Sequence, residues 1–512
     1  MHSPAARETG HTAWVLLATL SAIPLVIHLA GLLSHDYTYF IDEFYYLACA
    51  RRPALGYVDH PPLAPLTLAV TRVLLGDSLL GIRLLPFLAS SVTIWITGIL
   101  TRDLGGGWFA TVVACVAFAL APVFLGMTDF FSMNAFEPLI WASIVLLLVR
   151  VANGANPRWW LLIGALVGMG FENKHTIVAY LLALAGAVLV TRYRRVVRDP
   201  WLWAGTAVAL LIALPNIAWQ VTNGWPALEF YRAAQQLKNL PSTPLQSIAS
   251  QVMMLNPLAL PIWLAGLLFL VWSARARSIR FLGVAFLFLL IIHVASGTSR
   301  GDRTLAAYPP LFAAGGVVFE GVLRRTSARA AVVAAIVITG LFLAPLVVPL
   351  LAPPTLARYA GFLGQNKSPE RGKTSPLPQL LADRTGWPSF VDDMVAVYNR
   401  LPAEDRADAI LFAGDYGHAG ALELWGPARG LPPVICNHNT YYHWSIGKTD
   451  SRVLIAVGAR RRDLVSVYRS VEQVGVTRAE YGMNWRSAMP ILVARDPVVP
   501  LSTVWYRMRH YE

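Results

Sequence analysis

Apolar segments long enough to cross a bilayer are the feature that most constrains this chain. The first lies at 12–33, and ten more apolar runs follow near 81–101, 108–126, 133–151, 159–171, 176–191, 201–221, 256–273, 281–297, 306–323 and 330–351, of which 159–171 is short. A helix of about 20 apolar residues spans a hydrocarbon core of ~30 Å. With 56% hydrophobic and 14% charged residues, the chain is also far more apolar than an ordinary soluble enzyme. We therefore predict a polytopic α-helical membrane protein with about 11 transmembrane helices.

Three smaller features refine this prediction. No small-residue cleavage site follows the first apolar segment, which predicts an uncleaved signal anchor. The stretch 61–76 is short and opens with two prolines, so we expect a helix at the membrane interface there rather than a span. Cys49, Cys115 and Cys436 lie far apart without a CxxC motif, and we expect neither a disulfide framework nor a thiolate metal site.

Basic residues in alternate loops predict the orientation. With a cytoplasmic N-terminus, the inner loops contain every basic cluster, namely Arg102, Arg150 with Arg158, 192–198, 275–280, and Arg324, Arg325 and Arg329. This is the positive-inside pattern of a multi-pass protein of the inner (cell) membrane. It accounts for most of the net charge of +13, so nucleic acid is not an expected partner.

A change in composition after residue 351 predicts a second domain. The segments AILFAG (409–414), SRVLIAVG (451–458) and MPILVAR (489–495) are typical of short buried strands. The segments 387–402 and 463–475 have helical spacing. We predict a membrane module at 1–351, with a first extracytoplasmic loop at 34–80, and an α/β domain at 352–512. An odd number of spans places that domain on the extracytoplasmic side.

The predicted extracytoplasmic loops contain isolated charges of both signs close to the span ends. They are Asp42, Glu43, Asp59, Arg83, Asp129, Glu137, the segment ENK at 172–174 and the segment SRGDR at 299–303. Ionisable residues at membrane depth are costly and mark a substrate or ion path by default. For Asp129 and Glu137, an ordinary solvated loop charge is an equal alternative.

The pair Asp42 and Glu43 is the candidate for catalysis. On a short helix beginning near Asp42, Tyr45 and Tyr46 share the Asp42 face, whereas Glu43 points about 100° away. A partly desolvated carboxylate just outside a membrane is suited to take a proton from an acceptor hydroxyl. Helix capping by Asp42 is the alternative, but it does not account for the second polar pair, Asp59 and His60.

The turn YVDHPPL at 57–63 holds that second pair. Its two prolines keep His60 extended. Asp59 and His60 are candidates either for hydrogen bonds to sugar hydroxyls or for ligating a divalent metal, with Asp59 as the main metal candidate. Two adjacent ligands are a weak metal pattern, so a divalent metal is possible but no cofactor is required.

Basic groups of the same loops are candidates for binding a phosphate at headgroup level. They are Lys174, Arg300 and Arg303, with Arg83 at the start of a span. Arginine can bind phosphate in a bidentate manner. Snorkelling to the interface is the alternative for Arg300 and Arg303, while Lys174 lies in a tight turn between two spans.

Several motifs together resemble the bacterial glycosyltransferase family 39 group, relatives of the protein O-mannosyltransferases and of the aminoarabinose transferases that act on lipid A. They are the acidic pair after the first span, the turn before two prolines, RLLP at 83–86, NKH at 173–175 and AAYPPLF at 306–312. The likeness covers most of residues 35–320. It implies a GT-C fold, a polyprenyl-phosphate sugar donor, and transfer with inversion at the non-cytoplasmic face.

The resemblance also implies roles for residues. The catalytic acidic position of the family falls on Asp42–Glu43, its functional arginine falls on Arg83, and Tyr308 of AAYPPLF is a further substrate-binding candidate. The aminoarabinose branch has Glu-Lys before the prolines, and that Glu helps to hold a metal. Here the pair is Asp59-His60, a departure that puts the metal in doubt and removes a phosphate-binding lysine.

The resulting hypothesis is an inverting glycosyltransferase that uses no nucleotide cofactor. Asp42, assisted by Glu43, deprotonates a hydroxyl of a protein, lipid or cell-envelope glycan, while the cations stabilise the departing lipid phosphate. A lipid-linked sugar flippase or transporter is the alternative, although the charges gather at one surface and no inverted repeat is evident. A non-catalytic scaffold with a binding domain is a third class.

Two motifs of the predicted outer domain leave alternatives open. The segment AGDYGHAGALELWG at 413–426 is either ordinary turn chemistry or a phosphate-binding loop, although GxGxxG is absent. The segment CNHNTYYHW at 436–444 is either an acceptor contact or a packing surface.

Overall fold

The computed structural model describes residues 4–298, 300–365, 368 and 370–512, and it divides into two compact units. Unit 1 comprises 1–33, 80–218 and 240–350; unit 2 comprises 34–79, 219–239 and 351–512. The second unit therefore combines the first loop with the C-terminal region, whereas the prediction grouped that loop with the membrane module.

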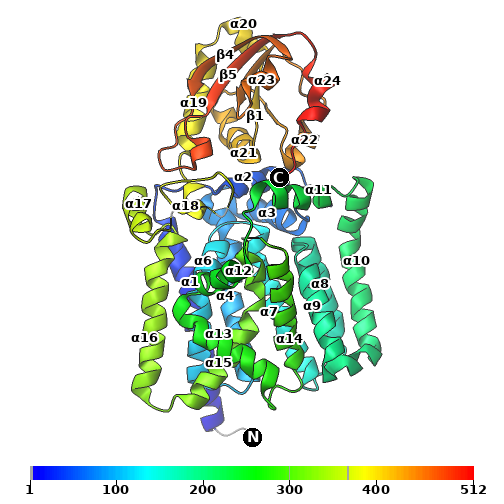
Figure 1. The fold of residues 1–512 in the computed structure, drawn as a ribbon, viewed down its shortest axis with the longest axis vertical. Coiled ribbons are helices and arrows are strands. Elements are labelled where there is room, and N and C mark those ends of the chain that lie inside the picture. The colour runs from blue at the N-terminus through cyan, green and yellow to red at the C-terminus, as the bar shows by residue number, and fades with distance from the viewer. Residues whose placement is uncertain (1–3, 299, 366–367, 369) are drawn as a thin grey trace. The chain divides into compact units, whose positions relative to one another are not determined.

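Unit 1 is a bundle of helices that run side by side (Figure 1). Its α-helices are α1 (Pro4–Leu32), α4 (Leu79–Asp103), α5 (Trp108–Ala119), α6 (Pro122–Thr128), α7 (Met133–Ala152), α8 (Trp159–Asn173), α9 (Ile177–Val190), α10 (Pro200–Thr222), α12 (Pro244–Met254), α13 (Leu260–Trp272), α14 (Arg280–Ala295), α15 (Pro309–Val322) and α16 (Thr326–Leu343). Short 3₁₀ helices include η1 (Arg192–Arg198) and η4 (Gly301–Ala307).

Each of the eleven predicted apolar segments coincides with a helix of this bundle. Among the described residues, five helices are long and apolar enough to cross a membrane alone, or up to nine if each bent pair forms one span. The fold class of a multi-pass helical membrane protein is confirmed, while the number of eleven spans stays a prediction. The bends explain part of the difference: four predicted segments lie on bent pairs such as α5–α6 and η4–α15, which each turn by 61° at a short break. The other two lie on the short helices α8 and α14, of 15 and 16 residues.

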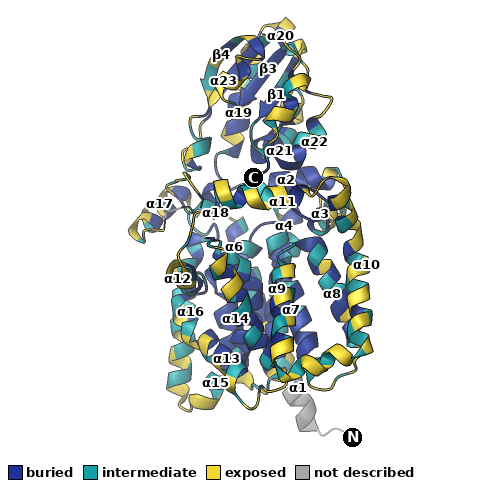
Figure 2. Cartoon of the chain, turned by 45° about the vertical axis from the view of Figure 1, so that its right-hand side comes forward, coloured by how far each residue is buried: buried dark blue, intermediate teal, exposed yellow. Residues whose placement is uncertain are grey.

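Apolar side chains are exposed on the outside of the helical bundle, as expected for a membrane module. Along α10, Leu210, Leu211 and Leu214 are 61%, 69% and 54% exposed, and exposed residues mark much of this helix (Figure 2). Such apolar side chains suit contact with lipid tails. Helices α5, α13 and α15 instead form the bundle core, where Gly266 and Gly315 let α13 and α15 pack in backbone contact.

Unit 2 contains the predicted α/β domain. Its strands are β1 (Ala409–Ala413), β2 (Val434–Cys436), β3 (Val453–Val457), β4 (Tyr468–Val476) and β5 (Pro490–Pro497), in the sheet order β2-β1-β3-β5-β4. β1 pairs in parallel with β2 and β3, while β5 pairs antiparallel with β3 and β4. The three segments predicted as strands form β1, β3 and β5.

The helices of unit 2 are α2 (Ile41–Arg51), α3 (Leu63–Leu75), α11 (Pro226–Ala233), α17 (Pro353–Phe362), α18 (Gln379–Ala382), α19 (Trp387–Arg400), α20 (Ala403–Ala407), α21 (Tyr416–Trp425), α22 (Asn439–Ser445), α23 (Arg461–Leu464) and α24 (Leu501–Val504), with a π-helical turn η2 (Ala234–Lys238) after α11. Helix α19 confirms the prediction for 387–402. Helix α3 confirms that 61–76 is helical and exposes Val70, Val73 and Leu74; its place at a membrane interface stays a prediction.

The helix predicted at 463–475 is wrong. Only the short α23 enters this segment, a turn follows it, and 468–475 belong to the strand β4, which pairs with β5. A register shift between Gln473 and Gly475 breaks the regular alternation of side chains. Such a bulge makes the apolar spacing of a strand resemble that of a helix, and tertiary pairing overrides the local pattern.

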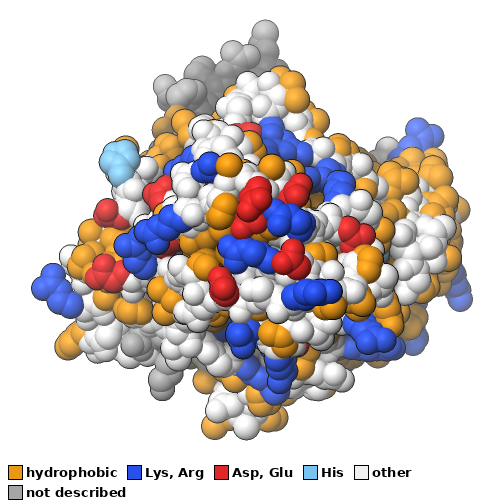
Figure 3. Space-filling model, turned by 90° about the horizontal axis from the view of Figure 1, so that it is seen from above, with side chains coloured by type: hydrophobic (Ala, Val, Ile, Leu, Met, Phe, Trp, Pro, Cys, Tyr) orange, Lys and Arg blue, Asp and Glu red, His pale blue; other side chains and the backbone are white. Residues whose placement is uncertain are grey.

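The surface seen in Figure 3 bears charges of mixed sign. Acidic and basic side chains lie next to one another on this face. In the α/β domain, Arg495 pairs with Asp405 at 2.8 Å, and Arg452 lies 3.0 Å from the same carboxylate. Interspersed charges of this kind suit a solvated surface.

Candidate active site

The two predicted catalytic carboxylates, Asp42 and Glu43, are adjacent in the first turn of α2 but have different hydrogen-bond partners. Phe40 has extended backbone angles, and the helix begins at Ile41. The backbone N–H of Phe40 donates to Oε2 of Glu43 at 2.8 Å. Glu43 is fully buried and accepts the N–H of the residue that precedes the helix, as the Glu of a capping box does. Helix capping is therefore a function of Glu43.

Asp42 points to a different set of groups. Its Oδ1 accepts a hydrogen bond of 2.8 Å from the hydroxyl of Tyr416, at the first turn of α21. Within the described residues, its Oδ2 accepts no hydrogen bond. The side chain is partly buried, so it keeps some access to solvent. This carboxylate is held by one oxygen and has a second oxygen available.

The surroundings of Asp42 disfavour its ionised form. Burial raises the pKa of Asp42 above its usual value, and the neighbouring carboxylates Asp59 and Glu370 add to this effect. Lys238 and the hydrogen bond from Tyr416 oppose it. A carboxylate with a raised pKa is a better match for proton transfer near neutral pH than an ordinary aspartate.

Asp59 belongs to the same group of residues. The hydroxyl of Tyr45 lies 2.8 Å from Oδ1 of Asp59 and 2.7 Å from Oγ1 of Thr440. The Thr440 hydroxyl oxygen also accepts the backbone N–H of Val58 at 3.0 Å. The ring of Tyr45 stacks on Tyr416 with centroids 4.9 Å apart. The two aspartates are thus held by two stacked tyrosines.

The side chain of His60 is buried and packs against aromatic residues instead of lying at the surface. The ring is 2% exposed and stacks on Tyr46 at 4.8 Å. Its Nδ1 lies 3.0 Å from the carbonyl oxygen of Pro61, and its Nε2 lies 3.8 Å from Sγ of Cys49. Both ring nitrogens therefore have partners inside the fold, and contact between His60 and a sugar stays a prediction.

A metal does not fit the residues around Asp59. Within the part of the chain that the structure describes, no three His, Cys, Asp or Glu side chains are grouped as a metal site requires. Asp59 has a tyrosine hydroxyl as its neighbour, and both nitrogens of His60 are engaged. The prediction of Asp59 as a metal ligand has no support from this geometry.

The two open motifs of the α/β domain both pack against the first loop. In 413–426, Asp415 caps α21 by accepting the N–H of Gly417 at 2.7 Å, which is ordinary turn chemistry. In 436–444, Tyr441 donates to Glu423 at 2.9 Å, and Trp444 lies under the guanidinium of Arg52 at 4.7 Å. The structure uses this aromatic segment for packing.

Glycines in α21 are site residues that the sequence reasoning missed. A Cβ on Gly417 would lie 2.2 Å from Cγ1 of Ile41, and one on Gly420 would lie 2.7 Å from Cβ of Phe44. Small residues at these positions allow α21 to approach α2 closely. Spacing of three residues between glycines was the available signal, but nothing in the sequence named α2 as the partner.

The predicted phosphate-binding residues all lie in unit 1. Lys174 forms an ion pair of 2.7 Å with Glu137 and is buried. The hydroxyl of Thr176 also donates to Glu137. Glu137 is therefore the counter-ion of Lys174 rather than a solvated loop charge.

The remaining unit 1 candidates have partners as well. Arg300 pairs with Asp302 at 3.0 Å, and Arg83 is 2% exposed. Arg303 is partly buried; Ser299, within the same predicted segment, lies outside the described residues. The hydroxyl of Tyr308 donates to Gln251 at 3.0 Å. Gln251 comes from α12, a helix that the sequence reasoning did not predict.

Another acidic group of unit 1 is internally satisfied. Asp129 accepts a hydrogen bond from Nδ1 of His28 at 2.8 Å, and Nε2 of His28 lies 3.0 Å from the Thr128 hydroxyl. All three side chains are buried. Asp129 is thus not an ordinary solvated loop charge.

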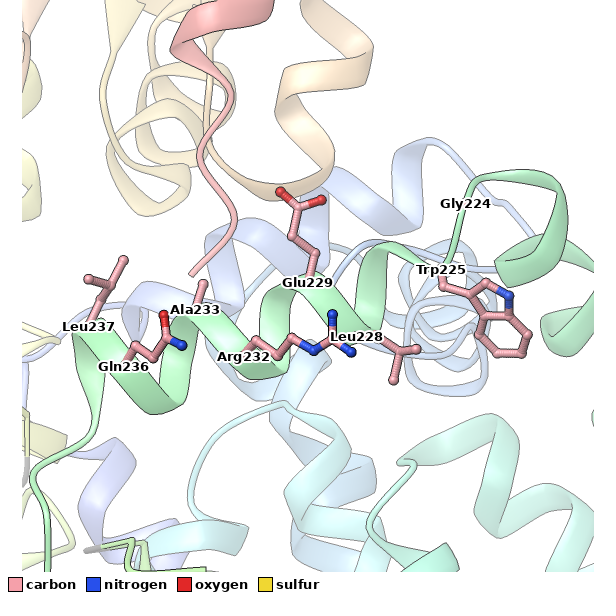
Figure 4. A pocket seen from close by; sticks show the side chains of 8 residues that line it. All are labelled: Gly224, Trp225, Leu228, Glu229, Arg232, Ala233, Gln236 and Leu237. Carbon is pink, nitrogen blue, oxygen red and sulfur yellow. The ribbon is translucent and has the colours of Figure 1, made fainter.

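A surface hollow on α11 is lined by residues other than the candidate site residues. It measures about 440 Å³ and is lined by Gly224, Trp225, Leu228, Glu229, Arg232, Ala233, Gln236 and Leu237 (Figure 4). Glu229 is already paired with Arg509 at 2.9 Å. None of the predicted site residues lines it.

Comparison with known proteins gives a family match and distant relatives. Residues 59–219 match the family described as dolichyl-phosphate-mannose-protein mannosyltransferase. Over 186 residues, the chain is 22% identical to an undecaprenyl phosphate-alpha-4-amino-4-deoxy-L-arabinose arabinosyl transferase 1 from Pseudomonas fluorescens. This match covers 35% of the chain and 32% of the relative, so it spans about a third of each protein.

Solved structures match over a greater length. ArnT from Cupriavidus metallidurans bound to undecaprenyl phosphate has a TM-score of 0.60 and 17% identity, over 94% of this chain and 98% of that chain. The oligosaccharyltransferase of Archaeoglobus fulgidus, in complex with Zn and sulfate, has a TM-score of 0.50 and 12% identity, over 96% and 76%. The fold implied by the sequence resemblance is therefore confirmed.

Proposed function

We propose that this chain, which has the GT-C fold and is similar to family 39 glycosyltransferases, is an inverting glycosyltransferase. It moves a sugar from a polyprenyl-phosphate donor to a hydroxyl acceptor at the extracytoplasmic face of the inner membrane, with its N-terminus in the cytoplasm. The observation that carries the proposal is the Asp42 carboxylate: it has one oxygen held by Tyr416 at 2.8 Å and a raised pKa. The family match and the relative named for an undecaprenyl-phosphate sugar support the donor class.

The reaction needs one proton transfer and one displacement. Asp42 takes the proton of the acceptor hydroxyl as its oxygen attacks the anomeric carbon. The bond between that carbon and the phosphate oxygen breaks, and polyprenyl phosphate leaves with the electron pair. A phosphate is a good leaving group, so the protein's main contributions are orientation of the two substrates and charge stabilisation.

Residues of unit 1 are proposed to bind the donor. Lys174, Arg300 and Arg303 bind the lipid phosphate, and Arg83 and Tyr308 complete the predicted donor contacts. Lys174 and Arg300 are paired with Glu137 and Asp302. Binding of a phosphate to them therefore requires that it compete with these carboxylates.

Within unit 2, the proposal assigns different roles to the carboxylates. Asp42 is the base. Glu43 supports the helix start, which positions Asp42 indirectly. Asp59, held by Tyr45, is a candidate for a hydrogen bond to the acceptor or sugar. No step uses a metal, because the residues around Asp59 do not form a ligand set.

The test is transfer by purified protein in detergent. Radiolabelled polyprenyl-phosphate sugars of several kinds are supplied with an extract of membrane acceptors, and product is compared for wild type, Asp42→Asn and Asp36→Asn. Asp36 is an exposed aspartate of the same loop, so it is the matched control. We expect label to move from one donor with the wild type and the control, and not with Asp42→Asn.

Two outcomes would contradict the proposal. Transfer by Asp42→Asn at the wild-type rate would remove Asp42 as the base. Binding of the lipid without consumption of any donor would favour lipid translocation, because a flippase acts only across a membrane barrier that detergent removes.

A further inference from the structure

We propose that Tyr416 of the α/β domain is a positioning residue that holds the Asp42 carboxylate in its reactive orientation. The inference rests on the proposed function, because it assigns a role within the same site. It also gives the C-terminal domain a task in the reaction itself.

The contact joins two distant parts of the chain. The Tyr416 hydroxyl donates to Oδ1 of Asp42 at 2.8 Å, across 374 positions of sequence. Tyr416 is 8% exposed, so this hydrogen bond is shielded from competing water. A hydrogen bond to one carboxylate oxygen fixes the side-chain rotamer and directs the other oxygen away from the donor.

The ring of Tyr416 is itself fixed. It stacks on Tyr45 at 4.9 Å, and the hydroxyl of Tyr45 is bonded to Asp59 and Thr440. Tyr416 also lies against His438, with ring centroids 4.8 Å apart. The phenol therefore has little freedom to turn away from Asp42.

The backbone that presents Tyr416 is also held in place. Its neighbour Asp415 caps α21 and lies 3.5 Å from Nδ1 of His418 and 3.3 Å from Nδ1 of His438. Gly417 and Gly420 press against Ile41 and Phe44 on α2. Since α21 contacts the same helix that carries Asp42, the distance between donor and acceptor is set by packed helices.

Other groups around Asp42 act through charge and do not replace this contact. Lys238, Asp59 and Glu370 influence the pKa of Asp42, and Lys238 lies 3.8 Å from Glu370. Tyr416 is the one described residue that donates a hydrogen bond to the Asp42 side chain. It can therefore control orientation as well as proton affinity.

The test uses Tyr416→Phe, which removes one oxygen and keeps the stacked ring. Tyr441→Phe is the matched control, because it removes a buried tyrosine hydroxyl bonded to Glu423 in the same domain. We expect Tyr416→Phe to lower kcat about 10-fold to 100-fold, the usual range for loss of a hydrogen bond to a charged group. The KM for the donor should change little.

The pH profile separates positioning from a merely structural role. The hydrogen bond from Tyr416 lowers the pKa of Asp42. Its loss should move the acid limb of kcat/KM to higher pH, whereas Tyr441→Phe should leave the limb in place. The position of the limb, unlike its height, does not depend on the fraction of protein that is folded, so it stays informative if Tyr416→Phe is less stable.

The possible outcomes distinguish the two proposals. If the wild type transfers sugar, and Tyr416→Phe matches Tyr441→Phe in rate and pH profile, the positioning role is overturned while the proposed function stands. If the wild type shows no transfer with any donor, the proposed function fails, and the role of Tyr416 fails with it. A lower kcat with a displaced limb in Tyr416→Phe alone supports the inference.

Discussion

The acidic group of unit 2 and the basic group of unit 1 differ in how their charges are compensated. Asp42 is held by a neutral hydroxyl, and within the described residues its second oxygen accepts no hydrogen bond. Lys174 and Arg300 each have a carboxylate partner, at 2.7 Å and 3.0 Å. A base must be ready before its substrate arrives, whereas a buried cation without a counter-ion would be costly until an anion binds. Under the proposed function, Asp42 would act on the acceptor directly, whereas the cations would exchange a carboxylate for the lipid phosphate.

The largest expected effect tests the division of roles between the two adjacent carboxylates. Asp42→Asn should lower kcat by about 10²- to 10⁴-fold, the typical contribution of general base catalysis, with little change in thermal stability. Glu43→Gln should lower stability by about 1 kcal/mol, because it weakens the bond to the Phe40 N–H, while specific activity of the folded fraction is retained. Transfer kinetics and thermal melting on the same preparations check both.

A reversed result would change the assignment. If Glu43→Gln removes activity at full stability and Asp42→Asn does not, Glu43 is the base and the capping role is secondary.

The second effect concerns the ion pair of unit 1. Lys174→Met leaves Glu137 buried without its counter-ion, which should destabilise the protein by about 3–5 kcal/mol. The double variant Lys174→Met/Glu137→Leu should recover most of that stability and still bind undecaprenyl phosphate more weakly than wild type. Thermal melting and titration with the lipid check the two quantities separately.

Equal lipid affinity in the double variant and the wild type would show that Lys174 serves only Glu137. The arginines alone would then bind the lipid phosphate.

A smaller effect is expected from the contact between α2 and α21. Gly420→Ala places a Cβ 2.7 Å from Cβ of Phe44 and 2.9 Å from its backbone, so helices must move apart, at a cost of about 1–3 kcal/mol. Movement of α2 should also lower kcat. Gly361→Ala on α17 is the control, because a Cβ there meets no atom within 4 Å. If both variants melt at the wild-type temperature, the close packing of α21 on α2 is not needed.

The smallest effect is a change of pH dependence from charges around Asp42. Lys238 lowers the pKa of Asp42, so Lys238→Met should raise it and move the acid limb of kcat/KM to higher pH. Glu370 raises that pKa, so Glu370→Gln should move the limb to lower pH. Activity is lost as pH falls through the limb because the base must be ionised. Shifts of the same sign in both variants would contradict this electrostatic account.

Much of the fold could be predicted from the sequence because its signals are local. Runs of apolar residues determine helices in a membrane, and all eleven runs are helical. Apolar segments bounded by turns gave β1, β3 and β5. The segment 463–475 was mispredicted because its strand depends on pairing with β5 and contains a register shift, neither of which is encoded in spacing alone.

The candidate site was predictable only in part. The helical period placed Tyr45 on the Asp42 side and Glu43 away from it, and the structure has this separation. Tyr416, Lys238 and Thr440 could not be found, because they lie far along the chain from the residues they contact or influence. The pairing of Lys174 with Glu137 could not be predicted either, because in the sequence both are isolated charges of different loops.

By itself, the sequence determined that the chain forms a bundle of apolar helices with an α/β region, and that carboxylates follow the first apolar segment. These properties depend on hydrophobicity and on spacing along one helix or strand. Only the tertiary structure decided which carboxylate caps the helix, which one is held by a tyrosine, and which cations are already paired. Those outcomes depend on close contacts between segments far apart in the chain, where a few ångströms separate a hydrogen bond from no interaction.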